Sequence, residues 1–154
     1  MDNKVKKYLE ETTKSIKENY KTETIKNLED IAIKEYGIKG IVETKYFNCP
    51  RIIKKKNEYA IFYYGLTENS KKAEIAHELG HKIAGHFEDR KISNFKKEIE
   101  ADYFARNLLN INWLGLQYFR ILNVLSKMFP SFSFLFPDIT EKQKIIDAGL
   151  KEFL

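Results

Sequence analysis

The sequence AEIAHELGHKIA, residues 73–84, combines a helical spacing of apolar side chains with two histidines that are one helical turn apart. Apolar residues that recur at intervals of three and four positions lie on one face of an α-helix. A helix with such a stripe packs it against a core, so we expect this helix to be largely buried. The residues of the stripe are Ile75, Ala76, Leu79 and Ile83.

The neighbouring residues indicate where this helix begins and ends. The polar group from Thr67 to Ser70 can cap a helix, and we expect the helix to begin just after it, near Lys71 or Lys72. Gly85 follows the last apolar position, where a glycine commonly weakens or ends a helix. The predicted helix therefore contains both histidines in its second half.

His77 and His81 are four residues apart, which places both imidazoles on one helix face and lets them bind one metal ion together. Glu78 follows the first histidine. In zinc peptidases with this pattern the glutamate binds no metal but takes a proton from the water that zinc makes acidic. We predict that His77 and His81 bind Zn²⁺ and that Glu78 is the base. Two surface histidines on an amphipathic helix are the alternative, which the apolar neighbours disfavour.

A catalytic zinc needs a third protein ligand, and the helix predicted for residues 95–109 offers the best candidate. Glu98 and Asp102 are one turn apart, so Glu98 could bind the ion while Asp102 accepts a hydrogen bond from a ligand histidine. Glu100 lies roughly opposite on this helix, so we expect it to face solvent or to form a salt bridge. A helix whose acids are merely solvated is the alternative.

Several residues could contact substrate or the oxyanion of a tetrahedral intermediate, where a second hydrogen-bond donor is useful. His86 and Tyr103 are the main candidates, together with the tyrosine pair 63–64, and the sequence does not choose among them. His86 is otherwise a polar residue just past the helix end, and each tyrosine is otherwise a packing residue. The strand predicted at 59–64 could present an edge on which an extended substrate pairs.

The rest of the sequence predicts an α+β fold in a single metallopeptidase domain, residues 1–154, with a small mixed or antiparallel sheet beside the histidine helix. N-terminal helices are expected over 1–36, followed by a catalytic core at about 37–110 and a helical C-terminal part at 111–154. In the core, Ile, Val, Tyr and Phe are frequent over 38–47 and 51–64, which favours strands. In the 95–109 helix, the residues expected to face the core are Ile99, Phe104, Ala105 and Leu108.

The C-terminal part is expected to contain a helix near 113–129, a Pro-bounded aromatic loop near 130–137 and a last helix from about Thr140. We expect no flexible linker within the chain.

Composition limits the other classes of function. The net charge is +5 with a pI of about 9.1, but the lysines are spread along the predicted helices, so direct nucleic-acid binding is not expected. A DNA-binding protein remains the reading that the charge alone would suggest. Cys49 is the only cysteine, which excludes an intrachain disulfide. With no apolar N-terminal segment and no stretch of membrane-spanning length, we expect a cytoplasmic protein.

Residues 73–86, followed by EIEADYFARNLL at 98–109, resemble the ImmA/IrrE metallopeptidases. The likeness covers roughly residues 37–110. It implies an active site similar to that of thermolysin-like peptidases, with the first glutamate of the second helix, here Glu98, as the third zinc ligand. It further implies a protein substrate, a helix-turn-helix transcriptional repressor of a phage or mobile element. The alternative is a metal-stabilised binding module that docks on a regulator without cleaving it.

Overall fold

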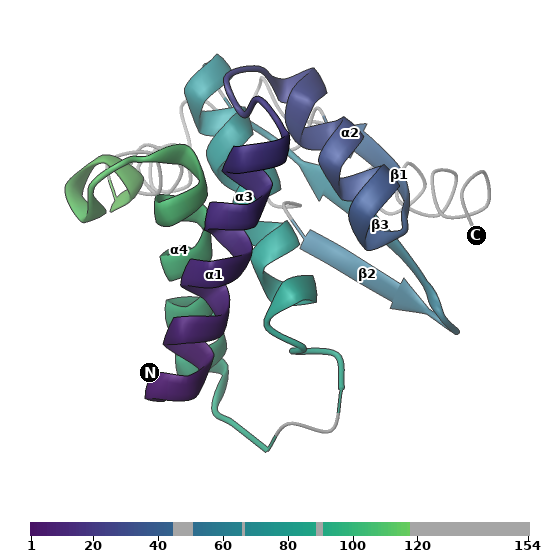
Figure 1. The fold of residues 1–154 in the computed structure, drawn as a ribbon. Helices are drawn as coiled ribbons and strands as arrows, with labels where there is room; N and C mark the ends of the chain where they lie inside the picture. Colours follow the sequence, from purple (N-terminus) through teal and green to yellow (C-terminus); the bar gives the residue numbers. More distant parts are fainter. Residues whose placement is uncertain (45–50, 66, 89–90, 118–154) are drawn as a thin grey trace, which may run out of the picture.

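The computed structural model describes residues 1–44, 51–65, 67–88 and 91–117. These residues form an α+β fold in which helices pack around one side of a small sheet (Figure 1), as the sequence predicts. Residues 113–117 are also helical, at the start of the helix predicted there. The elements are α1 (Asn3–Asn19), α2 (Ile25–Tyr36), β1 (Ile38–Glu43), β2 (Arg51–Lys55), β3 (Glu58–Tyr63), α3 (Glu68–Ile83) and α4 (Asn94–Leu109).

The three strands form a mixed sheet in the order β1-β3-β2, in which β3 pairs with β1 in parallel and with β2 antiparallel. The central strand β3 is nearly all buried. The prediction that residues 59–64 present an exposed edge is therefore wrong, because β1 and β2 occupy both sides of β3. The strand at the edge nearest the histidine helix is β2, which contacts α3.

Helix α3 begins at Glu68, earlier than the predicted start near Lys71 or Lys72. Thr67 is its N-cap and forms a capping box with Ser70. The hydroxyl oxygen of each residue accepts a hydrogen bond from the backbone N–H of the other. The helix ends at Ile83, and Gly85 follows with a φ of 69°, in the left-handed region that glycine tolerates. This glycine turns the chain back beneath the last turn of α3, where the His86 N–H donates to the His81 carbonyl at 3.1 Å.

Helix α4 packs closely against α3 at Gly80. A methyl group at this position would lie 2.9 Å from the Ala101 carbonyl oxygen, so only glycine lets the two backbones approach this closely. Phe104, Ala105 and Leu108 are buried as predicted. Ile99 is 39% exposed, contrary to prediction, because the buried face of α4 runs through residues 100, 101, 104, 105 and 108.

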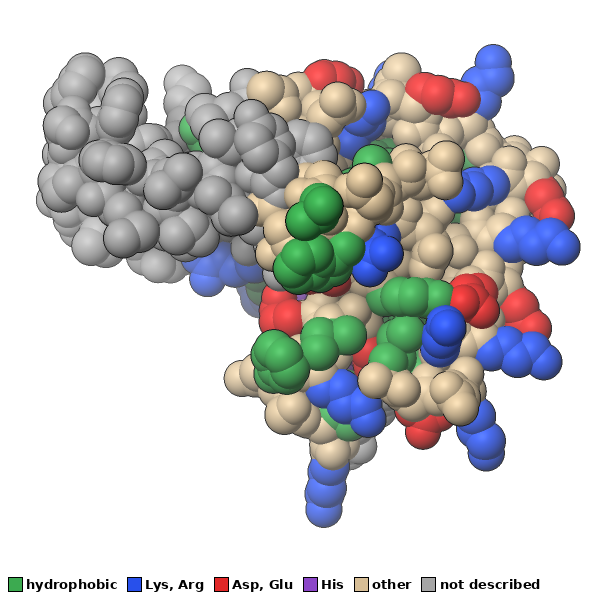
Figure 2. All heavy atoms as spheres, turned by 90° about the vertical axis from the view of Figure 1, so that its left-hand side faces the viewer, with side chains coloured by type: hydrophobic (Ala, Val, Ile, Leu, Met, Phe, Trp, Pro, Cys, Tyr) green, Lys and Arg blue, Asp and Glu red, His purple; other side chains and the backbone are tan. Residues whose placement is uncertain are grey.

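The two N-terminal helices, α1 and α2, cover the outer faces of α4 and α3. Helix α1 packs on α4 through a face that includes Leu9 and Ile16, and α2 packs on α3 and β1. On the face shown in Figure 2, the described Lys and Arg side chains are interspersed with Asp and Glu and form no patch of one sign. This distribution gives no support to a nucleic-acid surface on that face.

The loop near 130–137, the last helix from about Thr140 and most of the helix predicted for 113–129 lie outside the described residues, as does Cys49. Among the helices that the structure describes, none combines the length and the apolar character needed to cross a bilayer.

Candidate metal centre

His77, His81 and Glu98 converge where α3 and α4 pack together, and they form a group that could hold a metal ion. The two Nε2 atoms are 3.1 Å apart. One Glu98 oxygen lies 3.3 Å from His77 Nε2, and the other lies 3.4 Å from His81 Nε2. His77 is buried, whereas the Glu98 side chain is 48% exposed, so the group is closed on the protein side and open at Glu98.

The 3.1 Å between the two Nε2 atoms is close to the spacing that one tetrahedral ion requires. Two ligand atoms bound at about 2.0–2.1 Å and separated by the tetrahedral angle lie roughly 3.3 Å apart. The chemistry of the donors agrees, since two imidazoles and one carboxylate form a common ligand set for catalytic zinc. The three predicted ligands are thus brought together at one place.

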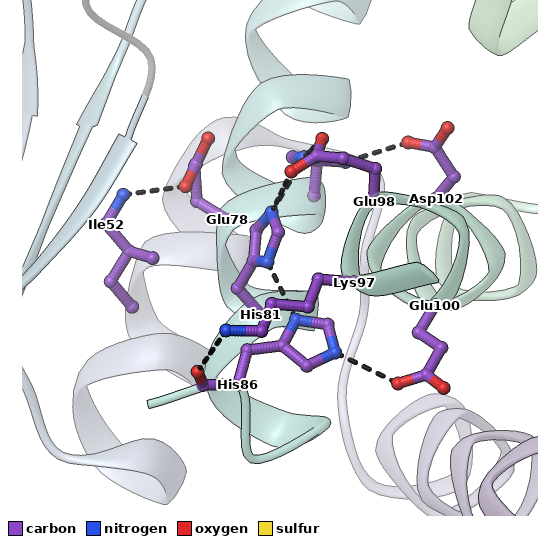
Figure 3. A network of polar contacts seen from close by, with 9 residues as sticks. Ile52, Glu78, His81, His86, Lys97, Glu98, Glu100 and Asp102 are labelled. Atoms are coloured by element: carbon purple, nitrogen blue, oxygen red, sulfur yellow. Dashed lines mark hydrogen bonds and ion pairs between the residues drawn. The ribbon is translucent and has the colours of Figure 1, made fainter. Parts of the chain in front are cut away.

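Asp102 supports the first histidine, as the sequence predicts. Its Oδ1 lies 2.8 Å from His77 Nδ1. A carboxylate accepts this hydrogen bond, so Nδ1 carries the proton and the Nε2 lone pair is left facing Glu98. Because Glu98 and Asp102 are one helical turn apart on α4, Glu98 can face the metal group while Asp102 contacts His77 Nδ1 (Figure 3).

Glu78 points from α3 toward the sheet rather than toward α4 (Figure 3). Its Oε2 accepts a hydrogen bond from the Ile52 backbone N–H of β2 at 2.6 Å. Burial raises the pKa of Glu78 from its ordinary value of 4.5 to about 7, against the opposing effects of His77 and of the Ile52 hydrogen bond. The glutamate between the two histidines is therefore held at the edge of the sheet, beside the metal group.

His86 and Glu100 form a buried extension of the site that the sequence reasoning missed. His86 Nδ1 lies 2.7 Å from His81 Nδ1, and His86 Nε2 lies 3.0 Å from Glu100 Oε2. Glu100 is completely buried, so its expected exposure to solvent is wrong, and the pairing that was the other expectation is found with His86. Helical spacing contained the signal, since Glu100 precedes the core residues Phe104 and Leu108 by one and two turns.

The remaining candidates for oxyanion contacts are directed elsewhere. Both ring nitrogens of His86 are bonded within the protein and the residue is buried, so neither faces a substrate here. The Tyr103 hydroxyl donates to Glu10 on α1. Tyr63 is buried in the core, and desolvation raises its pKa to about 12. Each of these three donors is thus bonded within the protein or buried in the core.

Comparisons of the chain with protein-family models, with curated proteins and with solved structures give no match. The function must therefore be inferred from the geometry of the site.

Proposed function

We propose that the protein is a zinc-dependent endopeptidase with His77, His81 and Glu98 as zinc ligands and Glu78 as general base. The observation that carries this proposal is the convergence of three donor groups: the two Nε2 atoms are 3.1 Å apart, and each lies within 3.4 Å of one oxygen of the Glu98 carboxylate, a donor set suited to zinc. Zinc in this position would make a water molecule acidic and polarise the scissile carbonyl.

The chain's own residues would supply the proton transfers. The Glu78 carboxylate adjoins His77 in sequence and lies between the metal group and β2, where it can take the proton of the attacking water. After the water oxygen bonds to the carbonyl carbon and the carbon–nitrogen bond breaks, the same carboxyl returns the proton to the leaving amine. An extended peptide that lies along β2, an edge strand of the described sheet, would pass beside Glu78.

For the substrate we propose a helix-turn-helix repressor, on the strength of the resemblance to the ImmA/IrrE metallopeptidases. The test is to incubate the purified protein with the repressor encoded nearest to its gene and to follow cleavage by mass spectrometry. We expect one zinc per chain, and cleavage that is lost with a chelator and with Glu78→Gln. The control is Glu11→Gln, at an exposed position on α1, which should cleave normally.

A second candidate function is a metal-stabilised module that binds a regulator without cleaving it. The hydrogen bond from Ile52 to Glu78 favours this candidate, because it gives the glutamate a structural role in joining α3 to β2. In that case the wild-type protein would bind zinc and the repressor but release no fragments. Cleavage that disappears in Glu78→Gln while zinc content stays at one per chain would exclude this module.

A further inference from the structure

We propose that His86 and Glu100 are positioning residues, which hold His81 in the tautomer whose Nε2 lone pair is directed at the metal group. This inference rests on the proposed metal site, and it adds two residues that bind no metal themselves. They form a continuous chain of hydrogen bonds with His81, from the end of α3 through the turn after Gly85 to the buried face of α4 (Figure 3).

The direction of the hydrogen bonds follows from the chemistry of the last group in the chain. In its ionised form Glu100 can only accept hydrogen bonds, and it then requires the proton of His86 to be on Nε2. A neutral imidazole then has its lone pair on Nδ1, which accepts a hydrogen bond from His81 Nδ1. His81 consequently carries no proton on Nε2, the atom that faces His77 and Glu98.

The opposite direction would be incompatible with metal binding. If His86 donated from Nδ1, His81 Nδ1 would have to accept, and the proton of a neutral His81 would occupy Nε2. Burial stabilises the order in which His81 donates to His86 and His86 donates to Glu100. Glu100 is completely buried and His86 is 5% exposed, so little water can compete for these hydrogen bonds. Lys97 donates to the His86 carbonyl at 3.2 Å and so brings a positive charge to the same turn.

Position in the helix explains why His81 needs a support different from that of His77. Asp102 on α4 is within 2.8 Å of His77 Nδ1, whereas His81 lies in the last turn of α3, with its Nδ1 directed at the turn that follows. The left-handed Gly85 returns the chain so that the His86 ring, with its centroid 4.9 Å from that of His81, fills this place. The His86 imidazole thereby connects His81 to the Glu100 carboxylate.

The test compares three forms of the full chain. His86→Phe combined with Glu100→Leu replaces both members of the pair by apolar side chains, so neither is left buried without the other, and we expect it to fold. His86→Gln is the conservative variant, because its amide oxygen can accept from His81 while its NH₂ group donates to Glu100. Circular dichroism and thermal unfolding verify that each form is folded.

The first readout is the tautomer of His81 in the metal-free proteins, measured by ¹⁵N NMR of the imidazole nitrogens at about pH 8, where imidazoles are mostly neutral. In the wild type and in His86→Gln we expect His81 to be protonated on Nδ1. In the double variant we expect a shift toward protonation on Nε2, while His77, which Asp102 holds, stays protonated on Nδ1 as an internal control. An unchanged His81 tautomer in the double variant would overturn the proposal.

The second readout is the affinity for Zn²⁺, measured by competition with a chromophoric chelator. Loss of such an outer partner typically weakens metal binding by about 10–100-fold, and we expect this in the double variant and near-wild-type affinity in His86→Gln. A wild-type protein that binds no zinc would refute the peptidase, but the tautomer measurement would still decide the role of His86 and Glu100. Zinc binding equally tight in the wild type and the double variant would contradict the role of the pair.

Discussion

His77 and His81 present the same nitrogen to the metal group but are supported in different ways. Asp102 contacts His77 directly, at 2.8 Å and near the surface, with 13% of its side chain exposed. The Nδ1 atom of His81 is linked through His86 to the carboxylate of Glu100, which is completely buried. The difference shows that one helix can supply two equivalent ligands although only one of them has an acid of the neighbouring helix beside its Nδ1.

Glu98 is common to both histidines, and its removal should have the largest effect. In Glu98→Ala we expect zinc affinity to fall by about 10³-fold or more, because a charged ligand is lost from a three-residue site. Equilibrium competition with a chelator measures the loss, and Glu11→Ala on α1 serves as the exposed control. If Glu98→Ala kept its affinity, the third ligand would have to be another residue.

Glu78 differs from both histidines in being held by the sheet, and its burial should be visible in the pH dependence of stability. Because its folded pKa of about 7 is above the ordinary 4.5, ionisation is harder in the folded chain, and the free energy of unfolding should fall between these pH values. At about 1.4 kcal/mol per pKa unit, the fall amounts to a few kcal/mol.

In Glu78→Gln the amide oxygen can still accept from Ile52, but no charge is buried, so this fall should be absent. Urea unfolding of the two metal-free proteins from about pH 4 to pH 9 measures the difference. Parallel stability curves for the two proteins would contradict the effect of burial.

Gly80 lies between the two histidines, so a change there should disturb both supports at once. In Gly80→Ala the new methyl group would meet the Ala101 backbone, and we expect a loss of about 1–3 kcal/mol in stability together with weaker zinc binding. Gly115→Ala is the matched control, because the nearest atom to its new methyl group would be a side-chain oxygen of Asn112, at 3.3 Å, rather than a backbone atom. Thermal unfolding and zinc competition follow both; an unchanged Gly80→Ala would show that the helices can separate freely.

The smallest effect should be the difference between the two supports. We expect Asp102→Leu to weaken zinc binding toward the upper end of a range of about 10–100-fold, and the His86→Phe, Glu100→Leu pair toward the lower end. A carboxylate that contacts the ligand imidazole raises its basicity more than one that acts through a second ring. Equal losses measured by chelator competition would show that the distance of the carboxylate has no influence.

Local patterns in the sequence indicated the α+β class, the helix of the two histidines, and the position of Glu98 and Asp102 on one face of the next helix. Each of these depends on residues within one element, where helical geometry fixes which side chains share a face. The start of α3 was misplaced because Thr67 and Ser70 both belong to the capping box, which begins the helix earlier than the apolar stripe does.

By itself, then, the sequence determined which side chains share a face within each helix, His77 with His81 on α3 and Glu98 with Asp102 on α4, because such spacing is a local property. Only the tertiary structure decided that β3 is central, that Glu78 is bonded to β2, and that Glu100 lies beneath His86. Strand order, helix contact and the path of a turn bring together residues that are distant in the chain. The spacing of apolar residues along the sequence does not predict these contacts. The close contact at Gly80 is what fixes the distance between the two halves of the site.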